Sequence, residues 1–134
     1  MPSVRKTVVA VFAAALLAST AQAEGNAVQI NLNAVEAQPN ACRLVLTAQA
    51  PSEISELIME TVLFDQSDRV MMLTLFDFAT LPAGKLRVRQ FDIPGASCSG
   101  ISRVLFNGVD SCQGPGCEAP VGASSAVKEI EVLG

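Results

Sequence analysis

The sequence has 134 residues, of which 50% are hydrophobic and 4% aromatic, and its formal net charge at pH 7 is −4. It contains no histidine, which excludes Ser-His-Asp and Cys-His catalysis, histidine acid–base chemistry and most zinc sites. An acidic chain also has no electrostatic attraction to nucleic acid or to anionic lipid. The composition therefore predicts neither a nucleic-acid partner nor a histidine-based active site.

Residues 1–23 have the layout of a secretory signal peptide. Two basic residues at 5–6 precede an apolar run at 7–18, TVVAVFAAALLA. The small residues of the Ala-Gln-Ala triplet at 21–23 predict cleavage immediately before Glu24. The apolar run is shorter than the roughly 20 residues that a spanning helix needs. We therefore expect a periplasmic or secreted protein with no membrane insertion after cleavage.

The remaining chain, residues 24–134, is predicted to be a single domain. Its 111 residues suffice for one domain and not for two. A domain of this size buries roughly 65% of the surface of its unfolded chain, so it can form a core without a metal. Its 7 basic and 13 acidic residues give a net charge of −6, which solubility explains. We predict no cofactor and no metal site.

All four cysteines lie in this exported part, and an even number in an oxidising compartment predicts two disulfides. Four cysteines allow three pairings. Cys112 and Cys117 flank the flexible turn Gln-Gly-Pro-Gly, which favours a bridge between them and leaves Cys42 with Cys98. A Cys98–Cys112 bridge is disfavoured because a predicted strand separates these two residues. Thiolates spaced in this way, without histidine, fit zinc poorly.

The first two predicted strands alternate clearly between apolar and polar residues. In residues 27–33, three apolar side chains alternate with glutamine and asparagine. A turn at residues 38–40 leads to a second strand, residues 42–49, whose even-numbered side chains are expected to point inward. Both segments are typical of half-buried strands.

Residues 54–65 are ambiguous between helix and strand. Ser52 could cap a helix, and SEISELIME contains helix-forming residues. The residues that follow, 61–64 (TVLF), are strand-like, and a two-turn helix would merge awkwardly into them. We predict a strand over residues 56–64.

The block Leu57 to Ile93 is the centre of the predicted fold. It holds three strand-like runs, each with a Phe-Asp pair, separated by the turn sequences DQSD and LPAG. These features predict a three-stranded antiparallel meander with strands at 56–64, 70–78 and 85–93. The middle strand is apolar on both faces, as expected of a strand within a packed sheet.

The C-terminal part adds two predicted strands. Residues 102–106 form one, which the turn dipeptide Asn107-Gly108 ends. Residues 111–125 contain few apolar side chains and are predicted to be a loop, and residues 126–133 alternate weakly enough to form a last strand. About seven short strands with turns between them predict an all-β fold, an immunoglobulin-like antiparallel β-sandwich that follows a cleavable signal peptide.

Four stretches carry a family resemblance: CRLVLTAQ at 42–49, ETVLFD at 60–65, LTLFDFATLPAGKLRVRQFDIPG at 73–95 and CSGISRVLFNGVDSC at 98–112. They resemble a group of small bacterial exported proteins of unknown function, often labelled Tat pathway signal sequence domain proteins. The similarity covers nearly all of the exported part, and the FD-I-P-G…C…I-x-R-V-L-x-N motif is fairly specific. The chain departs from the Tat pattern, because its signal has Arg-Lys at 5–6 and not Arg-Arg, and the Sec route is at least as well supported. The resemblance implies no activity and no catalytic residue.

One group of charged residues is a candidate partner-binding site. Lys85, Arg87 and Arg89 are spaced by two, so on a strand they share one face and form a basic stripe on an acidic protein. The alternative is a solvated strand face paired across the sheet with acidic residues. Phe91 and Ile93 have the same parity, so either the strand bulges or the stripe runs into apolar surface.

The carboxylates are assigned to structural roles. Two of them could in principle form a glycosidase pair, but the chain lacks the Trp and Tyr rings that usually stack on sugars. We expect the aspartates at these positions, Asp65, Asp77, Asp92 and Asp110, to lie at strand ends and to bond nearby backbone N–H groups. Asp65-x-Ser67-Asp68 resembles a calcium loop only weakly, because the central glycine and distal glutamate are missing.

Together these patterns predict a non-enzymatic module that acts by contact with another protein of the periplasm or cell envelope. The alternative is a carrier of a small ligand or ion, with its cavity between the two sheets.

Overall fold

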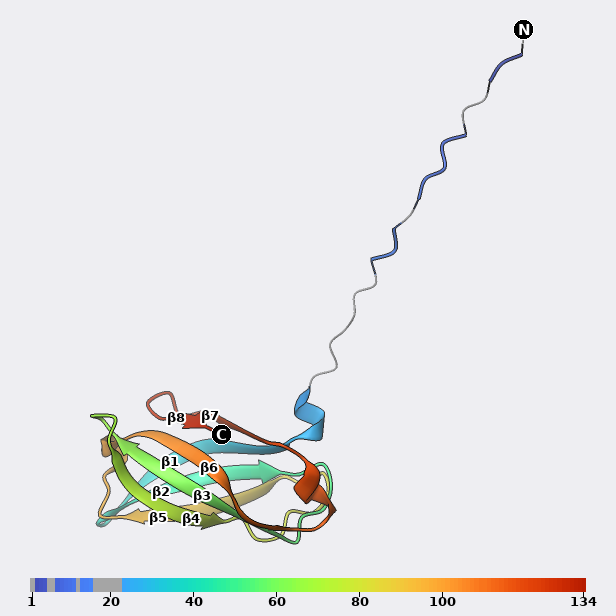
Figure 1. Ribbon diagram of the computed structural model, residues 1–134. Helices are drawn as coiled ribbons and strands as arrows, with labels where there is room; N and C mark the ends of the chain where they lie inside the picture. Colours follow the sequence, from blue (N-terminus) through green and yellow to red (C-terminus); the bar gives the residue numbers. More distant parts are fainter. Residues whose placement is uncertain (1, 5–6, 12, 16–22) are drawn as a thin grey trace.

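The computed structural model describes residues 2–4, 7–11, 13–15 and 23–134. Residues 1, 5–6, 12 and 16–22 of the predicted signal peptide lie outside these ranges, so the predicted cleavage site falls partly outside the described residues. A short 3-10 helix, η1 (Ala23–Asn26), leads into the first strand (Figure 1). No helix in the described part of the chain is long and apolar enough to cross a membrane.

In the described part of the chain, eight strands form two four-stranded sheets packed as a sandwich (Figure 1). One sheet has the order β5-β2-β1-β7 and the other β4-β3-β6-β8. This confirms the predicted all-β sandwich, with eight strands in place of about seven. The strands are β1 (Val28–Gln38), β2 (Ala41–Gln49), β3 (Glu56–Asp65), β4 (Val70–Asp77), β5 (Arg87–Pro94), β6 (Ile101–Gln113), β7 (Val121–Ser125) and β8 (Glu131–Leu133).

The strand order follows an immunoglobulin-like plan over the first six strands. The neighbours β5-β2-β1 correspond to strands E-B-A of such a sandwich, and the pair β3-β6 corresponds to C-F. The last two strands depart from the predicted antiparallel arrangement, because β7 pairs parallel to β1 and β8 pairs parallel to β6. The sandwich is therefore antiparallel inside and parallel at one edge of each sheet.

The predicted three-stranded meander is wrong. β3 and β4 pair as expected, but β5 leaves that sheet and pairs with β2. The connection between β4 and β5 is nine residues long, which is enough to cross from one sheet to the other. It also contains Phe78 and Leu81, both fully buried, which a simple hairpin would leave at the surface. Burial of these two side chains therefore favours the crossing.

Two further boundaries differ from the prediction. The dipeptide Asn107-Gly108 does not end a strand, because β6 continues through it with a bulge opposite Glu60 and Thr61. The Asn107 side chain donates to Glu60 Oε1 at 2.6 Å and does not form a local turn. Part of the predicted loop 111–125 is β7, and the predicted last strand shrinks to β8.

The core lies between the sheets and follows the period-two pattern of the strands. On β2 the inward side chains Cys42, Leu44, Leu46 and Ala48 are buried, as predicted. The strand prediction for residues 56–64 is also confirmed, because alternate residues of β3 are buried. Four phenylalanine rings pack against one another in this core: Phe76, Phe78, Phe91 and Phe106.

Candidate functional site

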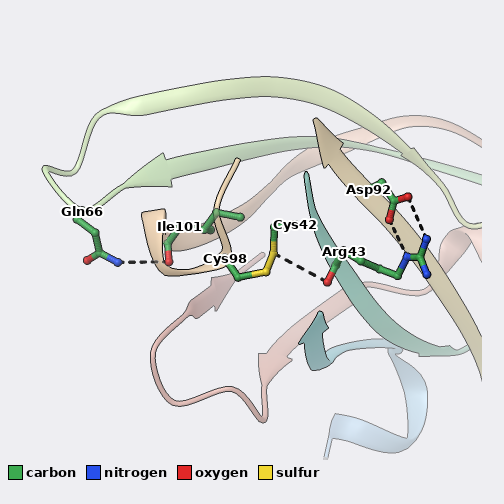
Figure 2. The surroundings of a disulfide bond; sticks show 6 residues. All are labelled: Cys42, Arg43, Gln66, Asp92, Cys98 and Ile101. Atoms are coloured by element: carbon green, nitrogen blue, oxygen red, sulfur yellow. Dashed lines mark hydrogen bonds and ion pairs between the residues drawn. A yellow bond between two sulfur atoms is a disulfide. The ribbon is translucent and has the colours of Figure 1, made fainter. Parts of the chain in front are cut away.

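Both disulfides form with the predicted pairing. Cys42 on β2 bonds to Cys98 in the 3-10 helix η2 (Cys98–Gly100), which immediately precedes β6 (Figure 2). This bridge joins the two sheets, because β2 and β6 belong to different ones. Cys112 bonds to Cys117 across the Gln-Gly-Pro-Gly turn. No free thiol remains among the described cysteines, so none of them can act as a nucleophile.

The small disulfide loop packs its glycines against the segment before β3. Gly116 lies in the 3-10 helix η3 (Pro115–Glu118), and its N–H donates to the Glu53 carbonyl at 2.8 Å. A Cβ atom on Gly116 would lie 2.6 Å from Ile54 Cγ1. Gly114 has a φ of +113°, a conformation that favours glycine. The loop is therefore closely fitted to the segment before β3.

The basic residues Lys85, Arg87 and Arg89 do not form one solvated stripe. Lys85 lies in the turn before β5. The β5 register runs without a bulge and sets Arg87 opposite Ala48 and Arg89 opposite Leu46, both of which point inward. The side chains of Arg87 and Arg89 therefore lie on the inner face of the sheet, the same face on which Ile93 near the end of β5 is buried. Their role in partner binding stays a prediction.

Arg89 is occupied by the protein's own backbone. Its Nε donates to the Phe78 carbonyl at 2.6 Å, and its Nη2 donates to the Thr80 carbonyl at 2.8 Å. Between these two carbonyls lies Ala79, which has a φ of 55°, unusual for a residue with a side chain. The guanidinium therefore holds the connection between β4 and β5 in the shape that crosses the sandwich.

Three of the aspartates are engaged in turns or in an ion pair. Asp65 Oδ1 accepts the backbone N–H groups of Ser67 and Arg69, and Asp77 Oδ1 accepts that of Ala79, as predicted. Asp92 differs from the prediction, because it pairs with a side chain on the neighbouring strand β2. Asp110 also differs, because it lies within β6 and not at a strand end.

The partner of Asp92 is Arg43, which donates through Nε at 2.7 Å and through Nη2 at 3.1 Å (Figure 2). This hydrogen bond lowers the pKa of Asp92, and the positive charge of Arg43 acts in the same direction, while burial opposes both. The pair is a cross-strand contact between β2 and β5. We assign it to stabilisation of the sheet edge.

An apolar row crosses the outer face of the β4-β3-β6-β8 sheet. The ladder places Leu73 opposite Val62, Val62 opposite Leu105, and Leu105 opposite Leu133, with one residue from each strand. Leu73 and Leu133 are 62% and 40% exposed, and Leu105 is half-buried. Val62 is only 6% exposed although it points outward, because its neighbours cover it. We refer to these four side chains as the outer row.

Further apolar side chains widen the outer row on β4. Leu75 is 51% exposed, and Met71 and Val70 are also exposed. Val70 lies opposite Phe64 on β3, and Arg103 lies over the Phe64 ring, 5.5 Å from its centroid, and donates to Glu131 at 3.0 Å. An apolar centre with a charged border is the usual composition of a protein interface.

The sequence reasoning missed this surface. The apolar residues of β4 favour a strand covered on both faces, but β4 is an edge strand and its outer face is exposed. The usable signal is the run Val70 to Phe76, which has no charged residue and shows apolar side chains at both parities. Such a run does not by itself say whether its second apolar face is covered.

Small hollows exist at the ends of the sandwich. One of about 550 Å³ lies between the β1–β2 turn and residues 95–99. Another of about 310 Å³ lies beside the β6 bulge and is lined by Met59, Phe106 and Pro120 among others. Within the described residues, no group of three or more His, Cys, Asp or Glu side chains is placed to hold a metal ion.

Comparison of the chain with protein-family models, with curated proteins and with solved structures found no match.

Proposed function

We propose that this chain is an exported, non-enzymatic β-sandwich module that acts by binding another protein of the periplasm or cell envelope. The observation that carries the proposal is the outer row, an apolar line across all four strands of one sheet. Exposed apolar patches of this kind mark sites of protein contact on small soluble domains. The two disulfides suit the oxidising compartment that such a role requires.

The surface also suggests the chemistry of the partner. The outer row is carried by a regular sheet, and ion pairs of Arg103 with Asp68 and Glu131 lie at its border. A complementary partner would present aliphatic or aromatic side chains toward the row and polar groups toward this border. Such an interface needs no catalytic group on this chain.

The experiment tests the part of the outer row that is farthest from β4. Leu105→Lys and Leu133→Lys place charges in the row while leaving the inward side chains of β6 and β8 in place. The wild-type protein, carrying a photo-crosslinker at Lys128, is first used to identify the envelope protein that it binds. We expect both variants to fold, by circular dichroism and thermal unfolding, and to bind that protein at least about tenfold more weakly.

A matched control uses the basic residues of the β4–β5 region. Lys85→Glu and Arg87→Gln change charge without touching the outer row, so their partner affinity should equal that of the wild type. If these two variants lose the partner while the two leucine variants retain it, the predicted basic site is correct and the outer row is not the interface.

The alternative function, a carrier of a small ligand, has one observation in its favour. The hollow beside the β6 bulge is lined by the core side chains Met59 and Phe106, and its volume of about 310 Å³ is at the lower end of the range for ligand sites. A carrier would show a rise in melting temperature with small apolar ligands that Gly108→Trp, which fills this hollow, abolishes. The protein-contact proposal expects no such rise.

A further inference from the structure

The only Asn-Gly dipeptide in the sequence lies inside a strand and not in a turn. Asn107 and Gly108 both belong to β6, and both are exposed to solvent. The register of β6 on β3 shifts at this point, which leaves Asn107 without a partner residue on β3 and sets Gly108 opposite Glu60. On its other side β6 pairs with β8 only over residues 103–105, so neither neighbouring strand pairs with Asn107.

Asparagine is a chemically labile residue, and most of all when glycine follows it. The backbone nitrogen of the glycine loses its proton to hydroxide and attacks the side-chain Cγ of the asparagine. An N–Cγ bond forms, and the Cγ–Nδ2 bond breaks as ammonia leaves. Water then opens the five-membered ring at one of its two carbonyls and leaves aspartate or isoaspartate. Glycine favours the attack because it has no Cβ, and no neighbouring atom lies within 4 Å of where a Cβ on Gly108 would be.

The fold holds the Asn107 side chain away from this reaction. Its Nδ2 donates to Glu60 Oε1 at 2.6 Å. A hydrogen bond to a carboxylate is stronger than one between neutral groups. Ring closure requires the side chain to turn toward the Gly108 nitrogen, so this hydrogen bond must break first. Ring closure also distorts the backbone between the two residues, which the pairing of Gly108 with Glu60 resists.

We propose that Asn107 is a site of spontaneous deamidation and that Glu60 suppresses the reaction in the folded protein. Glu60 does not take part in the bond changes, so it is a positioning residue. The reaction proceeds from the minor population in which the hydrogen bond is broken or β3 and β6 have separated locally. Each event consumes one water and releases one ammonia, and no other reagent is needed.

Deamidation also prevents the protecting contact from forming again. The product has a carboxylate at residue 107 where Asn107 had a donor, so two acceptors face each other and Glu60 loses its partner. Isoaspartate in addition inserts one methylene into the backbone of β6. The new charge lies two residues from Leu105 of the outer row. The reaction needs only water, so it is independent of the proposed binding of an envelope protein.

The experiment follows residue 107 by mass spectrometry while the protein is incubated at mildly alkaline pH in water enriched in heavy oxygen. Trypsin releases residues 104–128, in which Asn107 is the only asparagine. Deamidation adds one heavy oxygen to this peptide, and fragment ions assign it to residue 107. We expect the folded wild type to react at least about tenfold more slowly than the same protein unfolded in guanidinium chloride. Gly108→Ala should slow the reaction of the unfolded chain, because the added methyl group hinders the attack.

The protecting contact is tested with folded Glu60→Ala. This variant should react about tenfold faster than the wild type or more, because the charge-assisted hydrogen bond that competes with ring closure is gone. Glu56→Ala is the matched control. Glu56 also lies on β3 and accepts from a β6 side chain, Ser111 Oγ, at 2.7 Å, so this variant removes the same charge and an equivalent contact. Its rate should stay close to that of the wild type.

Glu60→Gln distinguishes the contact from a general loss of stability. It keeps a side-chain oxygen that accepts from Asn107, so it should react more slowly than Glu60→Ala. Three results would each overturn the proposal: a Glu60→Ala rate no higher than that of Glu56→Ala, equal rates for Glu60→Gln and Glu60→Ala, or a folded wild type that reacts as fast as the unfolded chain.

Discussion

Arg89 and Phe78 lie eleven residues apart, and the guanidinium Nε of the first donates to the backbone carbonyl of the second at 2.6 Å. The contact joins β5, in one sheet, to the residue that follows β4, in the other. A second bond from Arg89 to Thr80 encloses Ala79 between two fixed carbonyls. Arg89, which the sequence suggested as a partner-binding residue, therefore holds the backbone of the connection between β4 and β5.

Replacing Arg89 should destabilise the fold. Arg89→Met keeps much of the length and the apolar stem of the side chain but removes both bonds to backbone carbonyls, so we expect a loss of roughly 1.5–3 kcal/mol in the free energy of unfolding. Urea denaturation measures the loss. Lys85→Met is the control and should change stability by less than about 0.5 kcal/mol. Equal stability of the two variants would show that the carbonyls need no partner.

The two disulfides should differ in their contribution. The Cys42–Cys98 bridge closes a loop with a sequence separation of 56, and the Cys112–Cys117 bridge one of 5. In the chain-entropy model these loops correspond to roughly 4 and 2 kcal/mol. The double variants Cys42→Ala/Cys98→Ala and Cys112→Ala/Cys117→Ala, compared by urea denaturation, should lose stability in that order. Mass spectrometry before and after reduction verifies the bridges, and the reverse order of stability would contradict the expectation.

We expect that the small disulfide loop cannot accommodate an added methyl group at Gly116 without a loss of stability. Gly116→Ala places a Cβ 2.6 Å from Ile54 Cγ1 and 3.0 Å from the Glu53 carbonyl oxygen. Overpacking of this kind costs roughly 1–3 kcal/mol, which a lowered melting temperature would reveal. Gly108→Ala is the matched control, because a Cβ there meets nothing within 4 Å. Similar melting temperatures for the two variants would mean that the loop rearranges around the added methyl group at little cost in stability.

Stability should depend on the charge of Asp92 in acid. Its folded-state pKa is lowered by the hydrogen bond from Arg43, so the pair stabilises the fold above the unfolded pKa of about 3.9. That stabilisation is lost as the pH falls through the folded pKa. Arg43→Gln should therefore cost stability at pH 6 and less near pH 2. Denaturation at both pH values tests this, with Arg87→Gln as a control whose effect should not vary with pH in the same way.

Period-two patterns predicted much of the fold because burial alternates along a half-covered strand. The inward residues of β2, from Cys42 to Ala48, could be identified from the sequence because most of the residues between and after them are polar, with Val45 the exception. The disulfide pairing also followed from local features, since Cys112 and Cys117 flank a short flexible turn and Cys98 is separated from Cys112 by a strand.

The errors arise where tertiary contacts override local signals. The turn sequence LPAG suggested a hairpin, but burial of Phe78 and Leu81 carries the chain to the other sheet. The dipeptide Asn107-Gly108 suggested a turn, but pairing along β3 continues through it. Lys85, Arg87 and Arg89 are spaced by two and so are expected on one face of a strand, but this spacing does not say which face of the sheet is exposed to solvent. The outer row depends on strand order, which the sequence pattern does not contain.

The two parallel strands near the carboxyl end have a consequence for biosynthesis. β7 and β8 add the outermost strand to each sheet, and both lie within residues 121–133. A nascent chain still held in the ribosomal exit tunnel therefore lacks the last strand of both layers at once. The layer that contains β7 cannot be completed before residue 125 emerges, and the layer that contains β8 cannot be completed before residue 133 emerges, so final assembly of the sandwich must wait until this stretch leaves the ribosome.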